Sequence, residues 1–319
     1  MIGKETGEES FADFLTYQRP PKENHLDKVK RSLNWDRFGR ILRCAFKESR
    51  EGKTSYPPVI LFRMLLIQQW YALSDPATEE AVGDRLSFRR FVGLDLVSPV
   101  PDETTLCRFR NLLADKGLTK KLMNELSAQL DKKRLLVKRG TLVDASLVEA
   151  QAAPPGKDDS QPVDPDAKWT VKNDKPHYGY KLHVGVDEDS GLIRQVEMTS
   201  ANVHDSQVFD ELISGDEQAV LADKAYDKQS RRNTLKHRGV LDGILRKARR
   251  NAPLTQWDKT WNRYLGRRRA AVERVFGTLK QNYGFRRVRY LGLFRNASHP
   301  FLLVMAFNIK RMTVLEAAA

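Results

Sequence analysis

The stretch Gly140-Thr-Leu-Val-Asp144-Ala-Ser146 places a single carboxylate inside an apolar run that is typical of a buried strand. A second run of this kind, Ala219-Val-Leu-Ala-Asp223, also ends on an aspartate. A buried carboxylate without a partner is costly, and a metal ion is a partner that offsets this cost. Both aspartates are therefore predicted to end up beside a metal ion.

A third acid, Glu273, lies in a segment with helical periodicity, Arg267-Arg-Arg-Ala-Ala-Val-Glu273-Arg-Val-Phe-Gly-Thr-Leu-Lys280. At helical pitch, Arg269, Glu273 and Lys280 fall within roughly 40° of one another. The neighbouring stripe is apolar and consists of Val272, Phe276, Leu279 and Tyr283. One face of this helix is expected to pack, while its border presents an acid between two cations.

The charge of the chain is strongly positive and unevenly distributed. The 319 residues carry a formal net charge of +14. Residues 221–295 alone hold 21 Lys and Arg against five Asp and Glu, so the rest of the chain is close to neutral. Because this concentration surrounds Asp223 and Glu273, it favours a polyanionic partner. A solvated basic face without a partner is the alternative.

Composition excludes several classes of protein. No apolar run is long enough to span a bilayer, and the first ten residues are acidic and polar, unlike a signal peptide. The protein is therefore expected to be soluble and cytoplasmic, with no membrane partner. Its two cysteines, Cys44 and Cys107, lack a CxxC partner, so neither a disulfide framework nor structural zinc is expected.

The N-terminal part has the pattern of a small helical domain. Residues 1–34 are polar and weakly patterned, which predicts a loosely ordered leader. An all-helical domain is predicted over 35–134. Its helical patterns cover residues 35–48, 57–73, 78–94, 103–113 and 119–130.

One helix of this domain could read DNA. Asp102 is a suitable N-cap for the 103–113 helix, which carries Arg108 and Arg110. In a helix-turn-helix, residues near the start of the recognition helix reach base edges, so both arginines are candidate DNA contacts. A structural helix with a solvated edge is equally well supported.

From residue 135 the pattern changes to strands. After the Asp144 strand come a long loop over 151–176, a hairpin pattern over 179–199, a short helix over 206–213 and the Asp223 strand. A helix, a strand and the Glu273 helix complete the order. This is the order of the ribonuclease H-like fold, and it predicts an α+β catalytic domain over 135–315 with a mixed five-stranded sheet. A connection through a helix returns parallel, so Asp144 and Asp223 are expected at the same sheet edge.

These residues resemble those of the bacterial DDE transposases of insertion elements, in the insertion sequence five group and its relatives. The resemblance covers the chain from about Pro57 to Met312. Its motifs are Thr141-Leu-Val-Asp144-Ala-Ser146, Gly179-Tyr-Lys-Leu-His-Val-Gly-Val-Asp187, Thr199-Ser-Ala-Asn-Val-His-Asp-Ser206, Leu221-Ala-Asp223-Lys-Ala-Tyr226 and Arg269-x3-Glu273-x6-Lys280. One position departs, because Gly266 stands where the wider family signature has a tyrosine.

The resemblance implies that Asp144, Asp223 and Glu273 are the catalytic residues and also the ligands of two metal ions. Hard oxygen ligands suit Mg²⁺, with Mn²⁺ as a substitute. The implied enzyme binds the terminal inverted repeats of an element, cuts its ends and joins the 3′-hydroxyls to target DNA by two-metal chemistry. Because an element has two ends, a homodimer or higher homo-oligomer is expected, in a bacterial cytoplasm and associated with the nucleoid.

Cations near Glu273 are the predicted DNA contacts. Arg269 and Lys280 would hold phosphates near the cleaved bond, and an ion pair between Arg269 and Glu273 is the alternative. The surrounding arginines extend this basic surface and are Arg267, Arg268 and Arg274.

Three further residues are predicted accessory groups. His204 would bind a phosphate or orient a nucleophile, and otherwise belongs to the start of the next helix. Trp257 and Trp261 lie one helical turn apart and would stack an unpaired base, with core packing as the alternative.

Two other functions compete with transposition. One is a ribonuclease H-like nuclease or resolvase that cuts DNA without strand transfer, and the other is an inactive, transposase-derived DNA-binding protein. The intact acids count against the inactive protein. A helical domain able to recognise terminal repeats favours the transposase over the nuclease.

Overall fold

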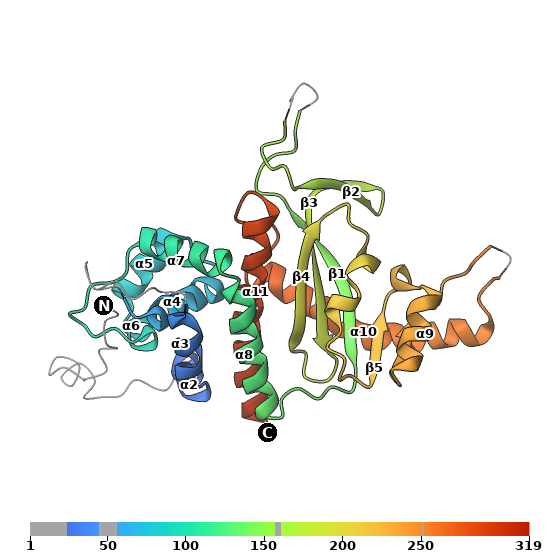
Figure 1. Ribbon diagram of the computed structural model, residues 1–319, viewed down its shortest axis with the longest axis horizontal. Helices are drawn as coiled ribbons and strands as arrows, with labels where there is room; N and C mark the ends of the chain where they lie inside the picture. The colour runs from blue at the N-terminus through green and yellow to red at the C-terminus, as the bar shows by residue number, and fades with distance from the viewer. Residues whose placement is uncertain (1–23, 45–55, 157–160, 251, 319) are drawn as a thin grey trace. The chain divides into compact units, whose positions relative to one another are not determined.

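The chain divides into two compact units (Figure 1). The computed structural model describes residues 24–44, 56–156, 161–250 and 252–318. One unit comprises Met1–Lys132 with Phe301–Ala319, and the other comprises Lys133–Pro300. The division after Lys132 lies close to the boundary predicted at residue 134. The C-terminal segment, however, belongs to the helical unit, whereas the prediction assigned residues up to 315 to the catalytic domain.

The helical unit is built around one helix that is buried on every side. Every residue of α4 (Pro58–Trp70) is buried. At its end the Trp70 indole donates a 2.7 Å hydrogen bond to the carbonyl of Ala306. The other helices of this unit are α2 (His25–Ser32), α3 (Trp35–Arg43), α5 (Asp75–Asp84), α6 (Leu86–Val92), α7 (Glu103–Asp115), α8 (Leu118–Lys132) and the C-terminal part of α11 (Leu293–Ala318).

Three details of this unit differ from the prediction. Helix α2 lies inside the expected 1–34 leader, where Asn24 forms a capping box with Asp27; residues 1–23 lie outside the described part. The single helix expected over 78–94 is two helices, because Arg85 between them has an extended backbone. Helix α11 has no counterpart in the prediction, and its internal Pro300 is a residue that normally ends a helix.

The second unit contains a mixed sheet of six strands, not five. Along the main path the order is β2-β3-β1-β5-β6, and β4 also pairs with β3. The strands are β1 (Thr141–Glu149), β2 (Lys168–Lys172), β3 (Lys175–Asp187), β4 (Ile193–Ser200), β5 (Ala219–Ala222) and β6 (Leu241–Ile244).

The extra strand is β2, which lies in the segment predicted to be a loop over 151–176. Its sequence, Lys168-Trp-Thr-Val-Lys172, does alternate polar and apolar residues, but none of the five is buried, so this short strand lacks the buried apolar face that marks the other strands. It pairs with the first residues of β3, while β4 pairs with the rest of the same edge. The predicted hairpin is confirmed as β3 and β4, and the parallel pairing of β1 with β5 is confirmed as well.

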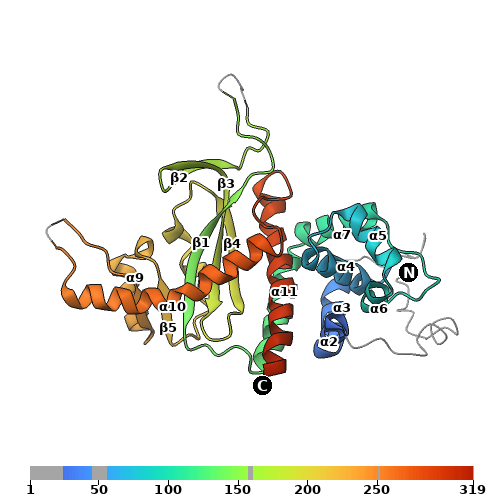
Figure 2. The ribbon, with the colours of Figure 1, turned by 180° about the vertical axis from the view of Figure 1, so that it is seen from behind.

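The two faces of the sheet carry different helices. One face packs into a core in which Val143, Val220 and Tyr226 meet Leu235 of α9 (Gln229–His237). The short 3-10 turns η1 (Asp205–Val208), η2 (Asp210–Leu212) and η3 (Lys224–Tyr226) contribute to this core, and the first two replace the predicted 206–213 helix. Helix α10 (Gln256–Gln281) crosses the sheet beside β1 and β5 (Figure 2).

Helix α10 starts at a capping box between Thr255 and Asp258. The buried residues of α10 include Val272, Phe276 and Leu279, as its predicted apolar stripe requires. Among the described residues, no helix combines the length and apolar character needed to cross a membrane.

Candidate active site

The fold brings Asp144 and Asp223 side by side. Strands β1 and β5 run parallel, and the last pairing, Val143 with Ala222, sets the two aspartates next to each other. Val143 points into the core shared with α9. Because side chains alternate along a strand, Asp144 points to the opposite face, where α10 lies.

Arg269 on α10 holds both carboxylates. Its Nη2 lies 3.1 Å from Asp144 Oδ2, and its Nη1 lies 3.7 Å from Asp223 Oδ1. The Arg269 side chain is 12% exposed, against 22% for Asp144 and 39% for Asp223. The guanidinium is thus a single, largely buried cation that faces two carboxylates.

Burial raises the pKa of Asp144 above its ordinary value. Arg269, the backbone N–H of Ala145 and Lys172 act in the opposite direction, while the neighbouring Asp223 raises the pKa further. The net direction is upward, so burial and the second carboxylate outweigh the positive charge supplied by the protein. Such a site favours an additional cation.

Glu273 lies on the same border of α10, one helical turn after Arg269, and is exposed. The ion pairs of Arg269 are with the two strand acids rather than with Glu273. In the described ranges, no group of three or more His, Cys, Asp or Glu residues lies close enough to hold a metal ion. The structure therefore brings together two of the three predicted acids, and the third lies one helical turn along α10 from the arginine that pairs with both.

The strand acids suit a hard divalent cation. Their donors are carboxylate oxygens, which Mg²⁺ and Mn²⁺ prefer over nitrogen or sulfur. Both carboxylates face the single cation of Arg269, and burial raises the pKa of Asp144 despite that cation. Asp144, Asp223 and Glu273 are the residues that could hold such an ion.

Two family models match the chain. Residues 136–309 match the family described as Transposase DDE domain, and residues 14–112 match the Transposase domain (DUF772). The chain belongs to the DDE transposase family. The predictions of a DNA transposase and of a ribonuclease H-like α+β fold are thereby confirmed.

Solved transposase structures share low sequence identity with this chain. The cryo-EM structure of a piggyBac transposase synaptic complex with hairpin DNA is 12% identical, with 92% of this chain and 74% of that chain covered and a TM-score of 0.41. The crystal structure of the Mos1 strand transfer complex is 12% identical, covering 82% and 79%, with a TM-score of 0.20. A pre-cleavage Mos1 transpososome is 11% identical, covering 96% and 90%, with a TM-score of 0.21.

Lys280 of the transposase lies farther along the same border of α10 and is partly buried. Burial lowers the pKa of Lys280, and the nearby cations Lys172 and Arg286 lower it further, against the opposing charge of Glu149. Lys172 acts on Asp144 as well, so it lies near both Asp144 and Lys280. Sequence reasoning missed Lys172 because it belongs to β2, the strand that was predicted to be a loop.

The arginines of α10 differ in their freedom to bind DNA. Arg267 and Arg274 are exposed. Arg268, by contrast, forms a bidentate pair with Glu188, which raises the pKa of its guanidinium. Arg267 and Arg274 are thus accessible at the surface, while Arg268 is engaged within the protein.

The recognition-helix prediction needs a correction at Arg110. Asp102 does cap α7, accepting a hydrogen bond from the N–H of Thr105. Arg108 is exposed, but Arg110 is 8% exposed and forms two 2.7 Å hydrogen bonds with Asp75. Because a buried charge needs a partner, the ion pair of Arg110 with Asp75 is structural. Arg110 is therefore not available as a DNA contact.

Of the three predicted accessory residues, His204 and Trp257 are exposed and Trp261 is half-buried. His204 is exposed, and its Nδ1 accepts the N–H of Ser206 at the start of η1. Trp257 and Trp261 stack with ring centroids 5.6 Å apart, and Tyr264 continues the stack. Trp257 is 61% exposed, so the core-packing alternative is wrong for this ring.

Tyr226 is a further residue that the sequence placed in a motif without a role. Its side chain is 1% exposed, and its hydroxyl has no hydrogen-bond partner in the part of the chain that the structure describes. Burial raises the pKa of this hydroxyl, and so do the carboxylates of Asp205, Asp144 and Asp223. The buried phenol is therefore close enough to the acid pair for both carboxylates to act on its hydroxyl.

Proposed function

We propose that this transposase, as a member of the insertion sequence five group, binds the terminal inverted repeats of an insertion element. It cuts the element's ends and joins the exposed 3′-hydroxyls to target DNA. The observation that carries the proposal is the pair of adjacent carboxylates, Asp144 and Asp223, held on the α10 face by Arg269. The basic segment over 221–295, which contains Asp223 and Arg269, is suited to the DNA backbone.

The three acids would hold two Mg²⁺ ions, with Mn²⁺ as a working substitute. Asp144, on the central strand, is assigned to both ions, and Asp223 and Glu273 to one each. When bound, the ions supply an activated water and neutralise charge on the phosphate. The helical unit, with Arg108 exposed on α7, would recognise the repeats, and the two ends would be joined by a homodimer or higher assembly in the cytoplasm, near the nucleoid.

Arg269 has a second task in this proposal. Its guanidinium faces the acid pair in the DNA-free protein, and with metal ions held by the acids it would be available to contact the phosphate beside the cut. A planar fork suits this exchange, because it pairs with carboxylate and phosphate in the same bidentate geometry. Lys280 holds the next part of the backbone as a point charge.

The proposal is tested with DNA that carries the element's terminal repeats. The wild type is compared with Asp144→Ala, Asp223→Ala and Glu273→Ala, and with Glu211→Ala as an exposed carboxylate outside the site. We expect Mg²⁺-dependent 3′-end cleavage and joining by the wild type and the Glu211 variant. Each of the three site variants should bind the repeats and fail to cut them.

Metal binding is measured separately by thermal unfolding. Mn²⁺ should raise the melting temperature of the wild type, because a ligand that binds only the folded state stabilises it. The shift should shrink in each site variant and persist in the Glu211 variant. Full cleavage by any one of the three site variants would overturn its assignment.

A further inference from the structure

Strand β2 and the first residues of β3 form an arm at one end of the sheet (Figure 1). Residues 175–178 of β3 pair with β2 alone, whereas β3 pairs with β1 from Gly179 onward. We call residues 168–178 the β2–β3 arm. Its tip is the turn Asn173-Asp174, where both residues have positive φ, as two-residue hairpin turns of type I′ require. The arm is thus a regular hairpin that extends past the end of β1.

The base of the arm is fixed by two aspartates that precede β2. Asp164 is fully buried, and its Oδ1 accepts hydrogen bonds from the Tyr180 hydroxyl at 2.6 Å and from the N–H of Gly292 at 3.2 Å. Asp166 Oδ2 accepts the N–H of Leu293 at 2.7 Å. The segment that leads into the arm is therefore bonded both to β3 and to the start of α11.

One face of the arm is basic. Cross-strand partners share a face, and the pairs Lys172 with Lys175 and Thr170 with His177 place four side chains together. Both lysines are exposed, and neither side chain has an ion pair or hydrogen bond within the described part of the chain. The whole arm holds three lysines against one aspartate. A face with this excess of cations favours an anionic partner.

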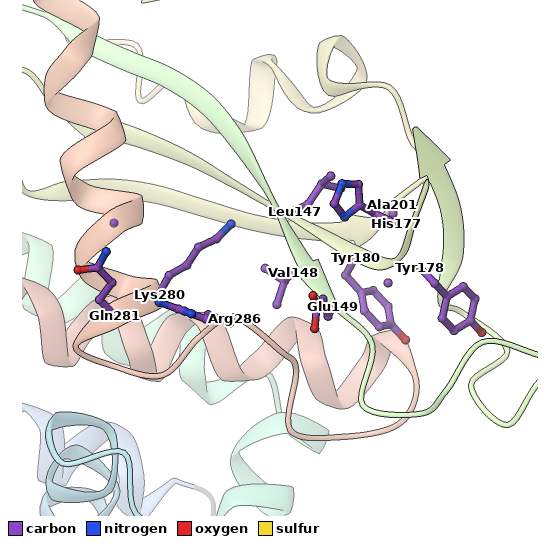
Figure 3. A pocket seen from close by; sticks show the side chains of 12 residues that line it. Leu147, Val148, Glu149, His177, Tyr178, Tyr180, Ala201, Lys280, Gln281 and Arg286 are labelled. Carbon is purple, nitrogen blue, oxygen red and sulfur yellow. The ribbon is translucent and has the colours of Figure 1, made fainter. Parts of the chain in front are cut away.

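The basic face is turned toward the end of α10 and the acid pair. His177 lines a pocket of about 320 Å³ together with Lys280 and Gln281 of α10 (Figure 3). Burial is the main cause of the shifted pKa values of Asp144 and Lys280, and the charge of Lys172 lowers the pKa of both groups. The lining of the pocket and the reach of Lys172 thus place the basic face beside the acid pair.

A cation near Asp144 can serve either the acid pair or a bound anion. Arg269 already lies 3.1 Å from Asp144 and 3.7 Å from Asp223, whereas Lys172 forms no ion pair with a described acid. Lysine is a point charge on a flexible stem, which suits it to hold phosphate without reading sequence. The exposed tip of the arm is therefore better suited to the backbone of DNA than to the acids.

We propose that the β2–β3 arm binds DNA and holds the phosphate backbone beside the cleaved bond through Lys172 and Lys175. The inference rests on the proposed function, since that function brings the DNA to the acid pair. The arm acts through charge, so its contacts position the DNA and carry no sequence preference. It adds a basic element outside the 221–295 segment, which holds most of the positive charge of the chain.

The charge of the tip is tested with Lys172→Gln and Lys175→Gln, and Lys168→Gln is the matched control. Lys168 is exposed on the same face at the base of the arm, and its Nζ donates to the Pro165 carbonyl at 2.9 Å. Affinity for the terminal-repeat duplex is measured without metal at several salt concentrations. Each tip variant should bind up to about tenfold more weakly and reduce the salt slope by about one. Lys168→Gln, and Lys172→Arg, which keeps the charge, should match the wild type.

The place of the arm on the DNA is tested by photo-crosslinking. Thr170→Cys, on the basic face, carries an azidophenacyl group in a chain whose two native cysteines are replaced by serine. Ser214→Cys, an exposed position before the start of β5, is the control. Lys172 acts on Asp144, charges are largely screened beyond about 10 Å, and Thr170 lies about 7 Å back along the strand. At about 3.4 Å per nucleotide, Thr170→Cys should crosslink within about five nucleotides of the cleaved phosphate, and Ser214→Cys should not.

A third measurement separates contact with DNA from support of the acid pair. Mn²⁺ is titrated into the DNA-free wild type and Lys172→Gln. The variant should bind Mn²⁺ at least as tightly, because it removes a cation that acts on Asp144. Weaker Mn²⁺ binding together with normal DNA affinity would assign Lys172 to the acid pair instead.

Two further outcomes would overturn the proposal. One is that Lys172→Gln and Lys175→Gln both keep the affinity and salt slope of the wild type. The other is that Thr170→Cys crosslinks a second copy of the chain instead of DNA, which would make the arm an interface between copies. Cleavage of the repeats in either case would leave the proposed function standing. Conversely, DNA binding that depends on the tip lysines without any cleavage would support the arm while removing the proposed reaction.

Discussion

Arg269 carries one positive charge, whereas Asp144 and Asp223 together carry two negative charges, so the acid pair is incompletely neutralised by the protein. Burial is the main cause of the raised pKa of Asp144, and the charge of the neighbouring Asp223 adds to it. An imbalance of this sign attracts cations, and it places Arg269 in competition with any metal ion that enters.

This competition predicts the effect of Arg269→Gln. Removing the guanidinium should abolish DNA cleavage, because the phosphate loses its fork, yet it should strengthen Mn²⁺ binding. An increase of up to about tenfold, or about 1.4 kcal/mol, is expected in calorimetric titrations of the DNA-free protein. Weaker Mn²⁺ binding by this variant would show that Arg269 supports the metal site instead of competing for it. Arg267→Gln, an exposed change on the same helix, serves as the control.

His183 should make the stability of the protein depend on pH. The residue is fully buried, and burial lowers its pKa from 6.5 to about 4, with Lys181 adding to the effect and Asp205 opposing it. The unfolded chain therefore takes up a proton near pH 6.5, while the folded protein resists until about pH 4. The free energy of unfolding should fall as pH drops through this window, by at most about 3 kcal/mol.

The measurement for His183 is urea unfolding at a series of pH values, for the wild type and for His183→Gln. The glutamine amide keeps a polar atom for Thr199, whose hydroxyl lies 2.9 Å from the histidine Nε2. Carboxylates also titrate in this range, so only the difference between the two proteins is assigned to His183. Identical pH dependence of the unfolding free energy in the two proteins would show that folding does not lower the pKa of His183.

The sequence predicted the acid pair because an isolated aspartate in an apolar run is visible without any partner. It could not predict the fate of Arg110, whose partner Asp75 lies 35 positions away and has no motif of its own. The same limit applies to Arg269. Its spacing to Glu273 gave a helix ion pair as the alternative to phosphate contact, but the parallel register of β1 and β5 brings Asp144 and Asp223 to it as partners.

At the scale of the element, α10 combines two surfaces. Its C-terminal half packs on the sheet and carries the border from Arg269 to Lys280. Its N-terminal half carries the stack of Trp257, Trp261 and Tyr264, with the Arg246 guanidinium 5.4 Å from the Trp257 ring centroid. Helical spacing alone could not separate these roles, because a stripe of large rings has the same period whether it is covered by a sheet or by solvent.

The exposed stack predicts a role for Trp257 in holding single-stranded DNA. Trp257→Ala should weaken binding of a short single-stranded oligonucleotide by about tenfold, within the range of about 1 to 3 kcal/mol for one stacked base. Its melting temperature should change little, because the ring is largely exposed. Binding is followed by fluorescence anisotropy. A variant that melts much earlier and binds normally would assign the stack to folding alone.

At the scale of the whole molecule, the distribution of charge matters more than its total. The chain carries a net charge of +14, and the 221–295 segment holds most of the excess, with α10 at its centre. A surface of this kind releases counterions when it meets DNA, so the logarithm of affinity falls linearly with the logarithm of salt concentration. Six phosphate contacts would reduce affinity about 10³-fold between roughly 50 and 200 mM salt.

Neighbouring arginines on α10 allow this charge effect to be separated from stability. Arg267→Gln and Arg274→Gln remove exposed cations, so each should reduce the salt slope by about one when it removes a phosphate contact. Arg268→Gln removes a cation that is bound to Glu188, so it should lower the melting temperature and leave the slope unchanged. The slopes are obtained from duplex DNA titrations at several salt concentrations. An affinity of the wild type that does not depend on salt would mean that the basic segment faces something other than phosphate. Salt slopes equal to that of the wild type in all three variants would place the DNA path away from α10.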